Sequence, residues 1–415
     1  MVKVNTFSNI LLFLVLFPYL SLIQTPFDTQ PFAIIFSILI FSIFLIRKDD
    51  NLSFPFPLWT LFLIFLYALG IYFINSNYYY GIRSLVGYAS VFFITFASYK
   101  TFKYFNIKIY IFSIYIWLFF GIVQLLFNKN FGSWFVPRMS TSVGRGVTSL
   151  AVEPSYYATV CIFALILNEL FYRNAKYNHK VYYLVMSILV FQIIISFSGS
   201  GFLFLLVFFF SKCISLIFFE RGIKKYRILF SSTIIFFLII LLFLYLPVLQ
   251  YTRAGILLKN TLKDPLTLLF TDQSVADRIS HVLLSFYSLF YSYGIGLGLG
   301  TWGDYSNLLT ASAGGRIEEI ANVWLSTGGR IMSGWGSTIY EIGIFGVLFI
   351  IVFLWIMFAG SRRNKEMKSV YFMSMLTMGF VMLMAVPIAF PLFGYTLGVF
   401  LYYTYRGKGQ EFQKE

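Results

Sequence analysis

The sequence contains very little cysteine, histidine and acidic charge. Its 415 residues include two cysteines, two histidines and 16 aspartates or glutamates. Cys161 and Cys213 both lie in apolar segments, so they provide neither a disulfide framework nor a thiolate metal site. The acidic residues are also too scattered to hold a hard cation such as Mg²⁺ or Ca²⁺. We therefore expect a protein without a bound metal and without another cofactor.

Apolar residues, by contrast, dominate the chain. Hydrophobic residues make up 59% of the sequence, charged residues make up 11%, and the mean hydropathy is +0.81. A soluble protein of this length could not hide so much apolar surface in one core, whereas a membrane protein exposes it to lipid. The composition predicts an all-α polytopic membrane protein whose surroundings are the lipid bilayer.

The excess of positive charge is arranged as in membrane proteins. The 31 lysines and arginines outweigh the acidic residues and give a formal net charge of +15. The basic residues form short clusters between apolar runs, which is typical of loops on a cytoplasmic membrane face. This placement argues against a nucleic-acid partner.

Apolar segments of nearly spanning length recur along the whole chain. A helix needs roughly 20 apolar residues to cross the hydrocarbon layer. The uncharged stretch between Lys180 and Lys212 is divided in two, because Ser198–Gly201 can make a tight turn. The first span is expected to be retained, since no small-residue cleavage site follows it. The predicted spans are residues 7–24, 31–46, 57–75, 84–99, 107–127, 151–171, 181–197, 200–217, 228–247, 337–358, 370–387 and 390–405.

Charge bias predicts how these spans are oriented. With about twelve spans and both termini in the cytoplasm, about two thirds of the 31 basic residues, Lys212 among them, fall on the cytoplasmic side. Residues 1–247 then contain spans one to nine, with an outer loop at 128–150. Residues 248–336 form a large outer loop with interfacial helices, and residues 337–415 contain spans ten to twelve and a cytoplasmic tail. Loops as long as the large one are usually functional.

Arginine is concentrated on the outer side. A planar guanidinium grips phosphate or carboxylate with two parallel hydrogen bonds, whereas lysine is sufficient to face anionic headgroups. The bias favours an anionic substrate at the outer face, although any one of these arginines could instead brace a loop. The outer basic residues are three lysines and seven arginines, namely Arg83, Arg138, Arg145, Arg253, Arg278, Arg316 and Arg330.

The most informative outer segment is a helix predicted at residues 275–292. Ser274 and Asp277 fit a capping box at its start. Arg278, His281 and three later serines follow at intervals of three and four residues, which places one polar stripe on an otherwise apolar helix. The helix N-terminus and Arg278 would keep His281 neutral, and a neutral imidazole could take a proton from a hydroxyl. The alternative is an interfacial helix whose polar stripe is wetted by solvent.

Three further features are a glycine-rich segment and two carboxylates at the starts of predicted spans. The glycine-rich segment 293–303 has the wrong spacing for dinucleotide binding and is interpreted as a turn whose backbone approaches a ligand or another helix. Glu153 lies at the start of span six, where an unpaired carboxylate is costly. Its predicted partner is Arg145, either in a catalytic site or in a structural ion pair. Glu341 is a third ionisable residue, near the start of span ten.

The order of these features resembles the Wzy-type O-antigen polymerases, which are relatives of the O-antigen ligases. The resemblance implies a GT-C-like helical fold in a bacterial inner membrane. It also implies an enzyme that joins oligosaccharide repeat units carried on undecaprenyl diphosphate at the periplasmic face, in lipopolysaccharide O-antigen biosynthesis. A chain-length regulator is a further candidate partner. The matching elements, in order over residues 140–350, are Arg145…Glu153-Pro154-Ser155, Arg278…His281, Gly294–Gly300 and Glu341–Gly346.

The outer residues agree with this chemistry. Charge develops on the lipid diphosphate as it leaves, and fixed guanidinium groups would stabilise it without a metal. The acceptor hydroxyl needs a base, for which we predict His281 first and Glu153 second, with Arg278 as a further catalytic residue. The predicted substrate-binding residues are Arg83, Arg138, Arg145, Arg253, Arg316 and Arg330.

Other membrane functions remain open. A flippase or other transporter of lipid-linked oligosaccharides would carry functional charge among its spans and short loops on both faces. Here the first five spans are almost free of charge and one loop is long, which favours an enzyme. An O-antigen ligase would use nearly the same outer site and is poorly separated from a polymerase by sequence. A non-catalytic scaffold would leave the outer arginine bias unexplained.

Overall fold

The computed structural model describes most of the chain, and its described part is α-helical. Within that part the β-structure amounts to one isolated bridge, between Ser76 and Leu299. The described residues are 2–21, 29–46, 54–136, 138–140, 146–174, 176–219, 255–256, 259–260, 264, 270, 272–325 and 330–405.

The helices fall into three groups along the sequence. The first group is α1 (Val2–Leu16), α2 (Phe32–Ile46), α3 (Phe56–Ile74), α4 (Tyr78–Thr101), η1 (Phe102–Tyr104), α5 (Ile107–Leu126), α6 (Pro154–Arg173), α7 (His179–Ile195) and α8 (Gly199–Phe219). The second group is α13 (Gln273–Tyr291), α14 (Trp302–Ala313) and α15 (Gly315–Trp324). The third group is α16 (Gly334–Ile342), α17 (Ile344–Arg363), η2 (Lys365–Met367), α18 (Lys368–Met384) and α19 (Pro391–Tyr405).

Many of these helices are suited to a membrane. Among the described residues, seven are long and apolar enough to cross one: α3, α4 with η1, α5, α6, α8, α17, and α18 with η2. Shorter apolar helices lie within α1 and coincide with α2 and α7. Large apolar side chains such as Phe73, Phe112 and Phe210 are exposed on the outside by 73%, 62% and 64%. The protein is therefore an all-α membrane protein, as the composition predicts.

The predicted spans can be compared with these helices one by one. Each predicted span that the structure describes overlaps a helix, and span 228–247 lies outside the described residues. The predicted division after span seven is confirmed, because α7 ends at Ile195 and α8 begins at Gly199. The total of about twelve spans stays a prediction.

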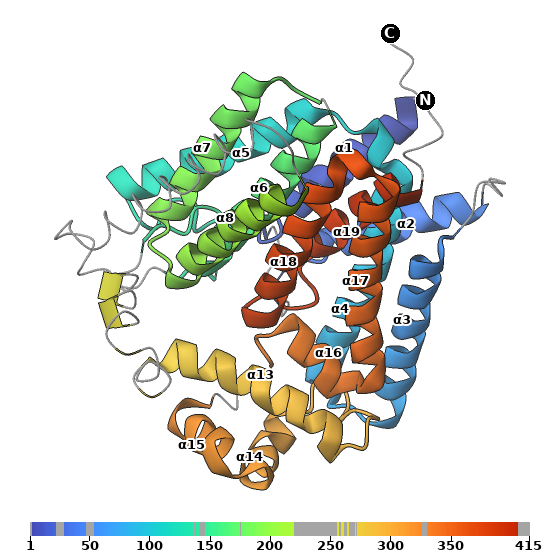
Figure 1. The fold of residues 1–415 in the computed structure, drawn as a ribbon, viewed down its shortest axis with the longest axis vertical. Coiled ribbons are helices and arrows are strands. Elements are labelled where there is room, and N and C mark those ends of the chain that lie inside the picture. Colours follow the sequence, from blue (N-terminus) through green and yellow to red (C-terminus); the bar gives the residue numbers. More distant parts are fainter. Residues whose placement is uncertain are drawn as a thin grey trace.

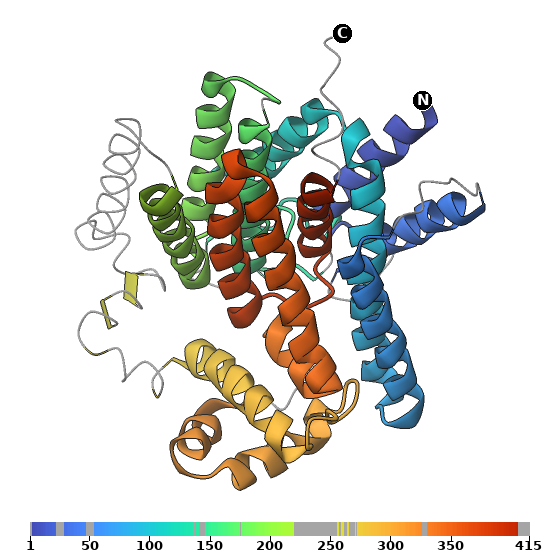
Figure 2. The ribbon, with the colours of Figure 1, turned by 45° about the vertical axis from the view of Figure 1, so that its right-hand side comes forward.

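The two ends of the molecule are formed by different elements (Figures 1 and 2). In Figures 1 and 2, α1 begins and α19 ends near one end of the molecule, while α13, α14 and α15 lie together at the opposite end. The turn between α3 and α4 and the helix α16 also lie toward the α13 end (Figure 1). The helices α13, α14 and α15 thus lie opposite the start of α1 and the end of α19 (Figures 1 and 2).

The predicted tenth span, 337–358, is wrong in one respect: it is not one helix. Gly343 breaks it with a φ of +57°, so that α16 ends at Ile342 and α17 begins at Ile344. The backbone of Gly294 fills the corner, where its carbonyl accepts a hydrogen bond from the Ile344 N–H at 2.8 Å. Of the two, only α17 is long enough to span the membrane, so α16 is a short separate helix before its N-terminus.

The helix predicted at 275–292 exists as α13, but its start is not where the capping box predicts it, and the alternative of a wetted polar stripe is not what the structure shows. The N-cap of α13 is Asp272, whose carboxylate accepts from the Val275 N–H at 3.0 Å, and not Ser274. The polar stripe is buried rather than wetted: Ser285 and Ser288 are 0% exposed, and their hydroxyls bond to backbone carbonyls of the same helix. Small serines let α13 pack closely on α16, whereas its aromatic residues face outward.

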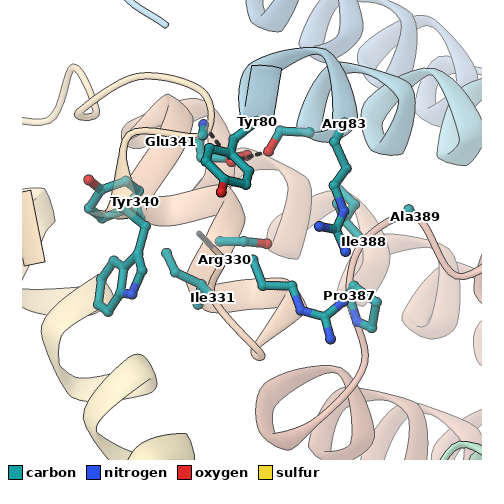
Figure 3. Close-up of a pocket in the computed structure, with 13 residues that line it drawn as sticks. Tyr80, Arg83, Arg330, Ile331, Tyr340, Glu341, Pro387, Ile388 and Ala389 are labelled. Atoms are coloured by element: carbon teal, nitrogen blue, oxygen red, sulfur yellow. Dashed lines mark hydrogen bonds between the residues drawn. The ribbon is translucent and has the colours of Figure 1, made fainter. Parts of the chain in front are cut away.

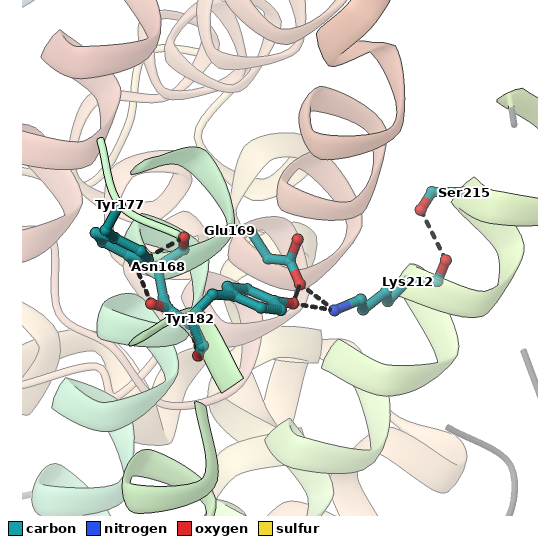
Figure 4. Close-up of polar contacts among 6 residues, drawn as sticks. All are labelled: Asn168, Glu169, Tyr177, Tyr182, Lys212 and Ser215. Carbon is teal, nitrogen blue, oxygen red and sulfur yellow. Dashed lines mark hydrogen bonds and ion pairs between the residues drawn. The ribbon is translucent and has the colours of Figure 1, made fainter. Parts of the chain in front are cut away.

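A second polar cluster lies between α6, α7 and α8 (Figure 4). The ammonium group of Lys212 pairs with the Glu169 carboxylate and donates to the Tyr182 hydroxyl at 2.7 Å. Lys212 is therefore buried inside the bundle, which corrects its predicted place in a cytoplasmic loop. Because the Tyr182 hydroxyl also donates to Glu169, the three groups satisfy one another, as a buried pair must.

Candidate active site

A pocket opens at the end of the bundle that carries the α3–α4 turn and α16 (Figure 3). Segments far apart in the sequence line it: the start of α4, the glycine-rich turn, residues 330–341 and the α18–α19 turn. Pro387, Ile388 and Ala389 form its apolar wall. Its polar lining residues include Tyr80, Arg83, Ser84, Arg330, Ser337, Tyr340 and Glu341.

Two of the predicted arginines meet in this pocket. The guanidinium groups of Arg83 and Arg330 lie on the same side, next to the apolar wall that contains Pro387 and Ile388 (Figure 3). Burial lowers the pKa of the Arg330 guanidinium, and Tyr19 opposes this shift. An arginine still remains charged near neutral pH, because its ordinary pKa is very high. The pocket is therefore lined by two positive charges, which suits an anion with several oxygens.

Tyr156 links the pocket to the other predicted residues. Nη2 of Arg330 donates a hydrogen bond to the Tyr156 hydroxyl at 3.0 Å. Tyr156 also interacts electrostatically with Glu153, Arg278 and Arg83. The fold thus brings three predicted arginines and one predicted carboxylate within electrostatic range of a single phenol, although they come from α4, the start of α6, α13 and the segment before α16.

Glu153 sits where the sequence places it, directly before α6. It is the N-cap residue of that helix, followed by Pro154 in the first turn, and Ser155 donates to its carboxylate at 3.3 Å. Its predicted partner Arg145 lies outside the described residues, so that pairing stays a prediction.

Glu341 is the buried carboxylate of the pocket. It lies in α16, which does not span the membrane, and it is 6% exposed. The hydroxyls of Ser84 and Tyr88 in α4 donate to its two oxygens, Tyr88 at 2.9 Å, and the Gly300 N–H donates at 3.3 Å. Burial raises the pKa of Glu341 to about 7, against the opposing effect of these hydrogen bonds. The sequence singles out Glu341 but assigns it no role.

His281 is placed differently from a base that faces substrate. Its side chain is 0% exposed, and its ring packs edge-on against Trp302 with centroids 5.1 Å apart. Nδ1 accepts a hydrogen bond from the Met332 N–H at 3.3 Å, and Nε2 lies 3.6 Å from an oxygen of Asp277. The Nδ1 lone pair is thus engaged by the backbone two residues after Arg330. This geometry favours a role for His281 in positioning the 330–332 segment.

The remaining predicted residues are dispersed. Arg138 and Arg316 are exposed, and neither lines the described pocket. Arg253, like Arg145, lies outside the described residues. The structure therefore gathers Arg83, Arg278 and Arg330, but not Arg138 or Arg316.

The glycine-rich turn forms part of the pocket wall. The Leu299 carbonyl accepts a hydrogen bond from the Asn77 N–H at 3.1 Å. The Leu297 N–H donates to the Tyr340 carbonyl at 2.7 Å. The turn therefore joins the α3–α4 turn to α16, and it holds the Gly300 N–H against Glu341. Of the two predicted uses of this turn, close approach to other helices is the one that the structure shows.

Several residues of the site are not predicted from the sequence. They are Ser84, which lines the pocket, Tyr88, which donates to Glu341, and Tyr19 and Tyr156, whose rings lie 5.6 Å apart. Tyrosine is frequent throughout this chain, with 30 copies, so no single one stands out. The sequence does contain one indication for Tyr156: it lies one helical turn after Glu153, so the two side chains are on the same side of the helix.

Comparison with known proteins identifies no relative. The chain matches no family model, no curated protein and no solved structure.

Proposed function

We propose that this protein is an O-antigen polymerase, a glycosyltransferase that joins undecaprenyl-diphosphate-linked oligosaccharide repeat units at the periplasmic face of the bacterial inner membrane. The observation that supports this proposal is the convergence of Arg83, Arg278 and Arg330 around Tyr156, beside a pocket with a buried carboxylate. Fixed guanidinium groups at the outer end of a membrane bundle suit a lipid diphosphate.

In the proposed reaction, each group of site residues has a separate role. Arg83 and Arg330 bind the diphosphate and stabilise the negative charge that grows on it as the sugar is transferred. Arg278 adds to the positive field from α13. Tyr80, which also lines the pocket and is 37% exposed, offers an aromatic face to a sugar ring. Transfer itself needs only a proton acceptor for the attacking hydroxyl.

A transporter is less well supported. Its coupling charges would lie midway across the bundle, next to a path for substrate. The buried pair Glu169–Lys212 is satisfied by Tyr182, and it lies in the C-terminal halves of α6 and α8, whereas the site residue Glu153 is at the N-terminus of α6. We interpret this pair as structural.

The test is a surface-polysaccharide gel on a bacterial strain whose copy is deleted and then complemented. A polymerase deletion leaves lipid core with one repeat, and the wild-type gene restores the ladder. Arg330→Ala should not restore it, and Arg330→Lys should restore only short products, because a point charge cannot replace the planar fork. Arg362→Ala, at the far end of α17, is the matched arginine control and should restore a normal ladder. Immunoblots confirm equal protein levels.

Other band patterns lead to other functions. Loss of every repeat-bearing band in the deletion strain would contradict a polymerase and point to the flippase or ligase. A full ladder with Arg330→Ala would remove that arginine from the site.

A further inference from the structure

Glu341 and the two arginines occupy different sides of one pocket. Arg83 and Arg330 lie beside Pro387 and Ile388, whereas Glu341 lies against the start of α4 and the glycine-rich turn (Figure 3). A site that transfers a sugar from a diphosphate needs these two functions separated in this way. One side must stabilise the leaving group and the other must receive the acceptor hydroxyl.

The Glu341 carboxylate is held in a fixed position but is not saturated with donors. A carboxylate has about four acceptor sites on its two oxygens. Oε1 accepts from Ser84 and the Gly300 N–H, and Oε2 accepts from Tyr88. Among the residues that the structure describes, Oε2 thus retains capacity for one more donor, and a substrate hydroxyl can supply it.

We propose that Glu341 is the catalytic base that activates the acceptor sugar hydroxyl, with Ser84 and Tyr88 as the residues that position it. This inference rests on the proposed function and names the residue that performs its proton transfer. Neither residue predicted for this role from the sequence lines the pocket: His281 is fully buried with Nδ1 engaged, and Glu153 caps α6.

The proton and electron pairs balance without a further reactant. As the acceptor oxygen forms its bond to the anomeric carbon of the donor, its proton moves to Glu341. The bond from that carbon to the diphosphate oxygen breaks, and the diphosphate leaves with the electron pair. Glu341 then returns its proton to the departing diphosphate or to solvent, which restores the ionised base.

The surroundings of Glu341 support a base that works near neutral pH. Burial raises the pKa of its carboxyl group to about 7, where a base is both substantially ionised and able to hold a proton. The charged and titratable groups that face it from the neighbouring elements are Tyr80, Arg83 and Tyr88 of α4, Arg330 before α16, and Tyr340 of α16. The α18–α19 turn contributes only apolar residues to the pocket.

The experiment measures polymer formation by the purified full chain in lipid nanodiscs, with undecaprenyl-diphosphate-linked repeat units as donor and acceptor, from pH 5 to pH 9. Because the base acts when ionised, the wild-type kcat should rise with pH through about 7. Glu341→Gln should lower kcat by about 100-fold or more and abolish this rise. Glu319→Gln, at an exposed position of α15, is the matched control and should behave as wild type.

A second variant keeps the test decisive if Glu341→Gln is poorly folded. Tyr88→Phe removes a hydrogen bond that favours the ionised carboxylate, so the rise of kcat should move to higher pH. A structural carboxylate would instead lower the rate equally at every pH and leave the midpoint unmoved. That result with Tyr88→Phe, or a normal kcat in Glu341→Gln, would overturn the proposal while the polymerase function stands. A wild-type protein that makes no polymer would overturn both.

Discussion

Tyr156 is the residue with which three arginines from different elements interact. Its hydroxyl accepts a hydrogen bond from Arg330 at 3.0 Å, and the charges of Arg83 and Arg278 act on the same phenol. Arginine side chains are long and lose much rotamer freedom when they are fixed, so a partner already in place favours binding of an anion. We therefore assign Tyr156 a positioning role rather than a chemical one.

Replacing Tyr156 by Phe tests this role with the loss of one oxygen atom. A hydrogen bond to a charged group contributes roughly 1.5–3 kcal/mol, so the KM for the lipid-linked donor should rise about tenfold or more while kcat changes less. Steady-state kinetics on the purified protein measure both quantities. Tyr371→Phe, which removes a hydroxyl bonded to the Phe400 carbonyl between α18 and α19, should lower thermal stability and leave KM unchanged. An unchanged KM in Tyr156→Phe would contradict the positioning role.

At the scale of elements, the glycine-rich turn and the break between α16 and α17 form one unit. The Ile344 N–H donates to the Gly294 carbonyl and the Gly298 N–H donates to the Glu341 carbonyl, at 2.8 and 3.2 Å. The turn therefore sets where α16 ends and where Glu341 is held. Gly294 and Gly296 both have positive φ, of 82° and 95°, but they differ in the space around them.

This difference gives a matched pair of substitutions. A Cβ at Gly296 would lie 2.6 Å from the Glu341 carbonyl oxygen, whereas a Cβ at Gly294 meets nothing within 4 Å. Gly294→Ala should cost only the backbone strain of a left-handed residue, about 1–2 kcal/mol. Gly296→Ala should in addition displace the end of α16 and abolish polymer formation. Thermal unfolding and the ladder assay measure the two effects, and equal behaviour of the two variants would refute the assigned contact.

At the scale of the whole molecule, the site and the chain ends are at opposite poles. The α13 end gathers Arg83, Arg278 and Arg330, whereas α17 and η2 carry Arg362, Arg363 and Lys365 at the other end. In a membrane this polarity predicts that α14 faces the periplasm and η2 faces the cytoplasm.

Single cysteines report this orientation directly. In a background with Cys161→Ser and Cys213→Ser, Asn307→Cys in α14 should react with a membrane-impermeant maleimide in cells whose outer membrane is permeabilised. Lys365→Cys in η2 should react only after lysis. Both positions are exposed in the fold, so burial does not account for a difference in labelling. Labelling of both from the same side would reject the proposed topology.

The sequence by itself determines the elements of this protein, for a simple physical reason. A backbone in lipid must satisfy its own hydrogen bonds, so each long apolar run has to be a helix, and runs are visible in one dimension. The described spans, apart from the break within 337–358, and the division between α7 and α8 could therefore be predicted, and helical periodicity predicted α13. The sequence also singles out Glu153, Arg278, Arg330 and Glu341, because charge is rare in such a chain.

Tertiary structure alone decides how those residues meet. The break at Gly343 depends on the carbonyl of Gly294, which lies 49 positions earlier in the chain. The burial of the Ser285 face depends on the small residues of α16, and the two hydroxyl partners of Glu341 come from α4, more than 250 positions away. Such contacts follow from packing in three dimensions, and helical periodicity within one segment contains no information about them.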